Sequence, residues 1–128
     1  MEKAGVKTRD ISFFSQKNGE MVRVHSKAAR DYAKFLENQD CVKRYEAGKL
    51  LELERFPHIS PAGIRKLYFN TQWSTDFFLH LSDGRKAVRE LVRGDDLKQQ
   101  ATVERLELSR RYWAALNIFD WKIVVASV

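Results

Sequence analysis

Between residues 74 and 93, apolar residues fall at every second position of two short runs that are separated by a turn. The apolar positions on one face of the first run are Phe77, Leu79 and Leu81. The second run places Val88, Glu90 and Val92 on one face. A period of two is typical of β-strands. Because glycine adopts the positive φ angle of a tight turn, Asp83-Gly84 predicts a two-residue connection, and the whole segment predicts an antiparallel hairpin.

Two longer segments carry apolar residues at helical spacing. Ser26 is the predicted N-cap of a helix that ends near Asn38. The apolar stripe of this helix is Ala28, Ala29, Tyr32, Phe35 and Leu36. A second helix is predicted from about Asp96 to Leu116, with Asp95 or Asp96 as its cap. The almost continuously apolar run 121–126 predicts an interior strand paired in parallel.

The remaining segments complete a single-domain α/β prediction. Residues 1–20 form a polar arm that is either partly disordered or paired as a short hairpin with 21–24. Two extended segments are expected around Gly48, at 42–46 and 49–53, and Pro57–Gly63 reads as a loop before a further strand at 65–71. The order helix, strands, helix, strand predicts one domain over 21–128, in which helices flank a mixed sheet.

Composition narrows the class of protein. The chain has 128 residues, of which 44% are hydrophobic, enough for one core. It contains no apolar run of about 18 residues and no signal-peptide pattern, which predicts a cytoplasmic protein without a membrane partner. Cys41 is the only cysteine, so an internal disulfide and a cysteine zinc cluster are excluded. The three histidines lack the spacing of metal ligands.

The charge is positive and unevenly distributed. The net charge is +6, and residues 1–44 contain ten Lys or Arg against six Asp or Glu. Lys27, Arg30 and Lys34 recur at helical spacing, which predicts a basic stripe that follows a DNA phosphate backbone. The alternative is an ordinary solvated face of the helix.

Two acids of the predicted hairpin are candidates for catalysis. Asp76 and Glu90 lie near one end of it, where two carboxylates can converge. Such a pair can hold Mg²⁺ against a phosphate group, as in metal-dependent nucleases. The alternative is a pair of solvated surface charges.

These motifs resemble a known family over roughly residues 20–127. The order of elements resembles the restriction-endonuclease-like PD-(D/E)xK fold, and more narrowly the N-terminal domain of TnsA, the endonuclease subunit of heteromeric transposases. Ser74-Thr75-Asp76-Phe77 is similar to that family's Thr/Ser-Pro/Thr-Asp-Phe motif. The segments 83–85 and 88–90 are similar to its hairpin turn and to the strand that bears its second acid, and 42–46 and 110–112 resemble neighbouring segments. The resemblance implies a Mg²⁺ site at Asp76 and Glu90.

The chain departs from the family in two catalytic positions. The family's first helix carries a Glu soon after a Ser, whereas Ser26 is followed by Lys27-Ala28-Ala29, and Asp31 is the nearest acid. The family's acid-x-Lys becomes Glu90-Leu91-Val92. Loss of the Glu weakens metal binding, and loss of the Lys removes help to the attacking water, typically worth about 10²- to 10⁴-fold in rate. Arg93 replaces the lysine only if a bulge shifts the register.

Three functions follow from these observations. The first is a catalytically impaired TnsA-like module that binds or processes DNA with a protein partner, in a transposition or phage assembly. The second is an active Mg²⁺-dependent endonuclease that uses Asp76 and Glu90, completed by Asp31 or a displaced basic residue. The third is a structural or regulatory module that contacts proteins only. The family's C-terminal winged-helix domain has no room in 128 residues, so the nuclease-like domain is expected to act alone.

Overall fold

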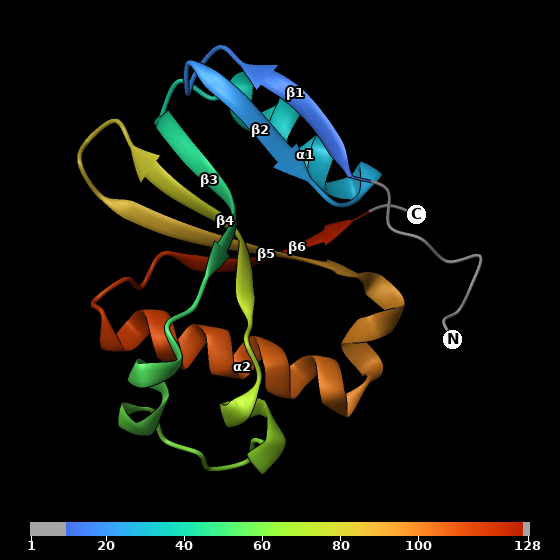
Figure 1. The fold of residues 1–128 in the computed structure, drawn as a ribbon, viewed down its shortest axis with the longest axis vertical. Helices are drawn as coiled ribbons and strands as arrows, with labels where there is room; N and C mark the ends of the chain where they lie inside the picture. The colour runs from blue at the N-terminus through green and yellow to red at the C-terminus, as the bar shows by residue number, and fades with distance from the viewer. Residues whose placement is uncertain (1–9, 127–128) are drawn as a thin grey trace.

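A computed structural model describes residues 10–126 (Figure 1). The helices and strands are β1 (Ile11–Ser15), β2 (Glu20–Val24), α1 (Lys27–Glu37), β3 (Val42–Leu50), β4 (Ser74–Leu81), β5 (Lys86–Arg93), α2 (Gln100–Ala115) and β6 (Trp121–Ala126). Short 3₁₀ helices are η1 (Leu53–His58), η2 (Lys66–Asn70) and η3 (Gly94–Lys98). None of the helices in this part of the chain is long and apolar enough to span a membrane.

The strands form a mixed sheet and a separate hairpin. The four-stranded sheet has the order β3-β4-β5-β6, in which β3, β4 and β5 are antiparallel neighbours and β6 runs parallel to β5. β1 and β2 form the two-stranded antiparallel sheet. The predicted single-domain α/β architecture, a mixed sheet with helices on both sides, is confirmed.

Each face of the main sheet has its own hydrophobic core. On one face, α1 and the β1–β2 hairpin cover Phe77 and Leu79. On the other face, α2 and the segment between β3 and β4 cover Phe78 and Val88 (Figure 1). The neighbours Phe77 and Phe78 therefore point to opposite faces, as the period of two predicts, and both are buried.

The first helix forms as predicted. The Ser26 hydroxyl accepts a hydrogen bond from the Ala29 backbone N–H at 3.0 Å and satisfies one of the free donors of the first turn. The helix ends at Glu37, with Asn38 as C-cap. Ala33 and Leu36 are buried against the sheet, which leaves the opposite side of α1 in solvent.

The β1–β2 hairpin is bonded firmly to the main sheet. Of the predicted polar arm, residues 1–9 lie outside the described residues, whereas Ile11–Ser15 pair with β2, the second of the two alternatives. The Asn18 side chain bonds both the backbone N–H and the carbonyl of Tyr45, at 3.0 and 2.8 Å. The buried Ser15 hydroxyl and the Tyr45 hydroxyl both donate to the Glu37 carboxylate. This hairpin is thus part of the folded domain.

Several predicted boundaries were wrong. The two extended segments around Gly48 are one strand, β3, which ends at Leu50. Residues 65–71 contain the 3₁₀ helix η2 in place of a strand, because Tyr68 and Phe69 pack into the same core, which consecutive residues of a strand do not do. Pro57, expected in a loop, lies inside η1. Four residues, Ser82 to Arg85, connect β4 and β5 in place of the expected two, and the Leu81 N–H bonds the Arg85 carbonyl at 2.8 Å.

The two C-terminal elements also differ from expectation. α2 begins at Gln100, after η3, and neither Asp95 nor Asp96 caps it. β6 is parallel to β5 as predicted, yet it is an edge strand, with Ile123 and Val125 exposed. A run of apolar residues therefore does not distinguish an interior strand from an edge strand.

Gly48 is the position of β3 where a side chain is expected to cost stability. Its φ angle is +65°, a region that other residues adopt with strain, although a Cβ there meets no atom within 4 Å. We expect Gly48→Ala to lower the free energy of unfolding by about 1 kcal/mol in urea denaturation. Gly94→Ala is the matched control, because its added Cβ makes ordinary contact with Val125 at 3.6 Å. Equal stability of the two variants would contradict this account.

Candidate functional site

Asp76 and Glu90 meet where β4 and β5 separate. The backbone pairing of these strands runs from His80 with Lys86 to Phe77 with Arg89 and stops before Asp76. Beyond it, the Asp76 carboxylate accepts a hydrogen bond from the Leu91 N–H at 2.7 Å, and the Glu90 carboxylate accepts one from the Asp76 N–H at 3.1 Å. At this end of the hairpin, hydrogen bonds from backbone N–H groups to the two carboxylates replace the backbone pairing of the strands. The structure thus brings the predicted pair of acids together.

Glu90 is fully buried within a polar network that includes α2. Its Oε2 accepts hydrogen bonds from the hydroxyls of Thr75, at 2.8 Å, and Ser109, at 2.6 Å. These hydroxyls in turn accept bonds from the indole N–H groups of Trp113 and Trp121, at 2.8 and 3.0 Å. Sequence reasoning missed Ser109 and both tryptophans, because no local pattern links α2 and β6 to this strand.

The surroundings of Glu90 raise its affinity for a proton, although the hydrogen bonds from Ser109, Thr75 and the Asp76 N–H act in the opposite direction. Burial, followed by the negative charge of the neighbouring Asp76, raises the pKa of Glu90 to about 7. Burial also raises the pKa of Asp76, although the Leu91 N–H and the charge of Arg105 act in the opposite direction. Two carboxylates this close favour a state that shares one proton.

A cavity of about 390 Å³ lies beside Asp76. Its wall contains the positions that the family resemblance singles out, namely Ser26, Ala29, Asp76 and Val92. Glu90 does not line it. Arg93 and Arg105 line it together with a second acid, Asp96, so cationic side chains are present in the wall although Val92 stands where the family has its lysine. Lys86, another basic residue of β5, pairs with His80 at the opposite end of the hairpin from Asp76 and does not line the cavity.

Glu90 is not free to bind a Mg²⁺ ion. Mg²⁺ is usually held through one or two carboxylates with free oxygens, but both oxygens of Glu90 already accept hydrogen bonds from buried donors. Asp31, the third acid considered, is 68% exposed at its side chain and pairs with Arg30. Within residues 10–126, no group of three acidic, His or Cys side chains is placed to hold a metal.

The predicted basic stripe lies on the outer side of α1. Lys27 and Lys34 are exposed, and Arg30 is half-buried, with its guanidinium 3.3 Å from the Asp31 carboxylate. The pairing offsets part of the charge of the stripe. Ala28 and Ala29, from the first turn of the same helix, line the cavity that contains Asp76, so the stripe and the cavity share one element.

The site therefore combines the buried Glu90, a neighbouring cavity that Asp76 and two arginines line, and a basic helix face. Such a combination offers contacts to an anionic polymer, whereas the Glu90 carboxylate takes part in bonds within the protein. No protein-family model matches the chain, and no curated protein is significantly similar to it in sequence.

Proposed function

We propose that this protein is a TnsA-like nuclease-fold module that binds DNA without cutting it and acts with a protein partner in a transposition or phage DNA-processing assembly. The observation that carries the proposal is the burial of Glu90. A nuclease needs this carboxylate free to bind metal, and here Thr75, Ser109 and the Asp76 N–H occupy its oxygens. The acids then serve the fold rather than the chemistry.

The topology supports the resemblance on which this proposal rests. α1 is followed by the antiparallel strands β3, β4 and β5, then by α2 and by β6, parallel to β5. The resemblance expects the two acids on the second and third of these strands, where Asp76 and Glu90 lie. Ala29 and Val92, at the positions of the missing Glu and Lys, line one cavity with Asp76.

Charge supports DNA as the ligand. The exposed face of α1 presents Lys27 and Lys34 to solvent, and Arg93 and Arg105 border the adjacent cavity. A duplex laid along α1 places phosphates against the stripe and next to the cavity that Asp76 lines. Contacts to phosphates without base readout give affinity that depends strongly on salt and weakly on sequence.

Fluorescence anisotropy with a labelled duplex tests this proposal. If Lys27, Arg30 and Lys34 each neutralise one phosphate, affinity should fall about 40-fold between about 50 and 200 mM salt. Reversal of all three to Glu should abolish most of the binding and most of the salt dependence.

A second triple variant serves as the control for net charge. Lys43→Glu with Lys86→Glu and Lys122→Glu changes the charge equally at exposed lysines outside α1. Unchanged affinity in the α1 variant, or equal losses in both variants, would show that the stripe is merely solvated surface.

One observation favours an active Mg²⁺-dependent endonuclease as the second candidate. Asp76 lines a cavity together with Arg93 and Arg105, and an arginine can stabilise a phosphate during cleavage. In this alternative, DNA entry must release Glu90 from its hydrogen bonds. Metal-dependent cleavage by the unmodified protein distinguishes it from the first proposal.

A further inference from the structure

The segment between β3 and β4 builds a second site, on the α2 side of the sheet. Residues 51–73 fold into η1 and η2 and enclose a hollow of about 790 Å³. Figure 1 shows this segment, in green, next to α2 and on the opposite side of the sheet from α1. Hollows of about 300–1,000 Å³ are typical of sites for small molecules.

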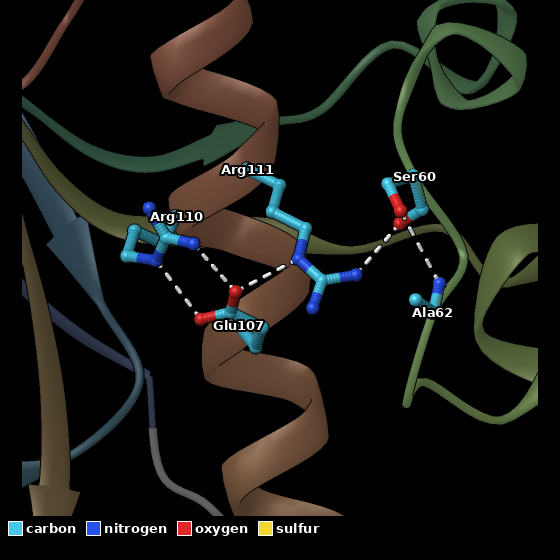
Figure 2. Close-up of polar contacts among 5 residues, drawn as sticks. All are labelled: Ser60, Ala62, Glu107, Arg110 and Arg111. Carbon is cyan, nitrogen blue, oxygen red and sulfur yellow. Dashed lines mark hydrogen bonds and ion pairs between the residues drawn. The ribbon is translucent and has the colours of Figure 1, made fainter.

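Hydrogen bonds from α2 hold the segment in place. Figure 2 shows Arg111 between Glu107 and Ser60: its guanidinium bonds the Glu107 carboxylate and the Ser60 carbonyl, both at 2.7 Å. The backbone N–H of Arg65 donates to the Glu104 carboxylate at 2.6 Å, and the Arg65 guanidinium donates to the same carboxylate. The hollow is thus formed before any ligand arrives, which lowers the entropic cost of binding.

The lining of the hollow is apolar apart from one cation and one amide. Phe56, Ile59 and Ile64 are buried side chains that form its floor. Lys66 is the only charged residue that lines it, and Asn70 the only other polar one. Lys66 is exposed and forms no ion pair with any of residues 10–126, whereas the glutamates of the same segment, Glu52 and Glu54, do not line the hollow.

We infer that this hollow binds an amphiphile with one carboxylate group and an apolar chain. The chain covers Phe56, Ile59 and Ile64, and the carboxylate accepts hydrogen bonds from the Lys66 ammonium and the Asn70 amide. One lysine matches the single charge of a carboxylate, whereas a phosphate monoester carries about −1.5 to −2 and would leave charge uncompensated. This inference is independent of the proposed DNA binding.

Decanoate is the probe that tests the inference, with decanol and decyltrimethylammonium as uncharged and cationic counterparts. In two-dimensional ¹⁵N–¹H NMR titrations, decanoate should cause saturable chemical-shift changes at residues 53–70. Decanol should bind about five- to tenfold more weakly than decanoate, and the cation should not bind. Lys66→Gln should reduce decanoate affinity to that of decanol and leave decanol binding unchanged.

A glutamate at one of two exposed leucines tests the hollow, and a glutamate at the other serves as its matched control. Leu53→Glu, at the lining, should abolish decanoate binding, whereas Leu67→Glu, more exposed and outside the lining, should not alter it. Lys43→Gln controls for loss of a distant positive charge. Equal affinity for decanoate and decanol, shifts spread over both faces of the sheet, or no saturable shift would each overturn the inference.

Discussion

The stability contributed by the Glu90 carboxyl is expected to fall by about 3 kcal/mol as the pH rises from its ordinary pKa of 4.5 to the folded-state value of about 7. In the unfolded chain the group ionises near 4.5, whereas in the folded protein burial and the Asp76 charge favour its protonated form. The folded state therefore binds more protons than the unfolded state in this window. The contribution is complete below pH 4.5 and is lost as the pH approaches 7.

Glu90→Gln isolates this contribution, because the amide has the same shape and does not titrate. Urea denaturation of both proteins across pH 4–8 should show the variant gaining about 3 kcal/mol relative to the unmodified protein as the pH rises. The amide nitrogen cannot accept the hydrogen bonds that one Glu90 oxygen accepts, which costs the variant stability at every pH alike, so the change with pH carries the result.

Glu37→Gln is the control with the opposite sign. The hydroxyls of Ser15 and Tyr45 and the Lys17 N–H lower the pKa of Glu37 despite its partial burial. The stability that Glu37 contributes is therefore present above 4.5 and is lost as the pH falls through its lower folded-state pKa. A difference between the unmodified protein and Glu90→Gln that does not change with pH would contradict the assignment of a buried proton to Glu90.

Metal-dependent nicking of supercoiled plasmid is expected to appear when Ala29→Glu is combined with Val92→Lys. Both positions line the cavity with Asp76, so the new carboxylate supplies a second metal ligand in place of the buried Glu90, and the new ammonium helps to position the attacking water. Recovery of such proton-transfer help is worth about 10²- to 10⁴-fold in rate. Each single variant should cut far less than the pair, because the groups act as a unit.

The control is the same pair of changes in an Asp76→Asn background, which should not nick. Val92 is 5% exposed, so a lysine there can unfold the protein, and circular dichroism must show a folded variant first. Ala29→Glu alone remains testable in any case, through Mn²⁺ binding followed by water proton relaxation. Efficient cleavage by the unmodified protein, lost in Asp76→Asn, would favour the active endonuclease instead.

Sequence patterns predicted those elements whose formation depends on residues close together in the chain. The alternation around Phe77 and Phe78 predicted a strand, which the structure buries on both faces. Ser26 marked the start of α1, because its hydroxyl bonds the N–H of Ala29, only three residues further along the chain. The hairpin also brings Asp76 and Glu90 together as expected, although its connection is longer than the predicted two-residue turn and the register differs accordingly.

Contacts between distant parts of the chain decided the rest. Ser109 lies 19 residues from Glu90, and Trp113 lies 38 from Thr75, so the network that seals Glu90 has no periodic signature. The edge position of β6 likewise depends on the sheet order, because an apolar run has the same composition at an edge as in the interior.

The Glu90 network also gives the protein an internal optical reporter. Two indoles, those of Trp113 and Trp121, are each one hydroxyl group away from the carboxylate. Loss of the Glu90 proton changes the local electric field and the polarisation of both N–H groups, because hydrogen bonds in a chain strengthen one another. Trp73 bonds instead to the Tyr68 carbonyl, outside this network, and supplies a constant background. We therefore expect the intrinsic emission of the unlabelled protein to change with the protonation of Glu90.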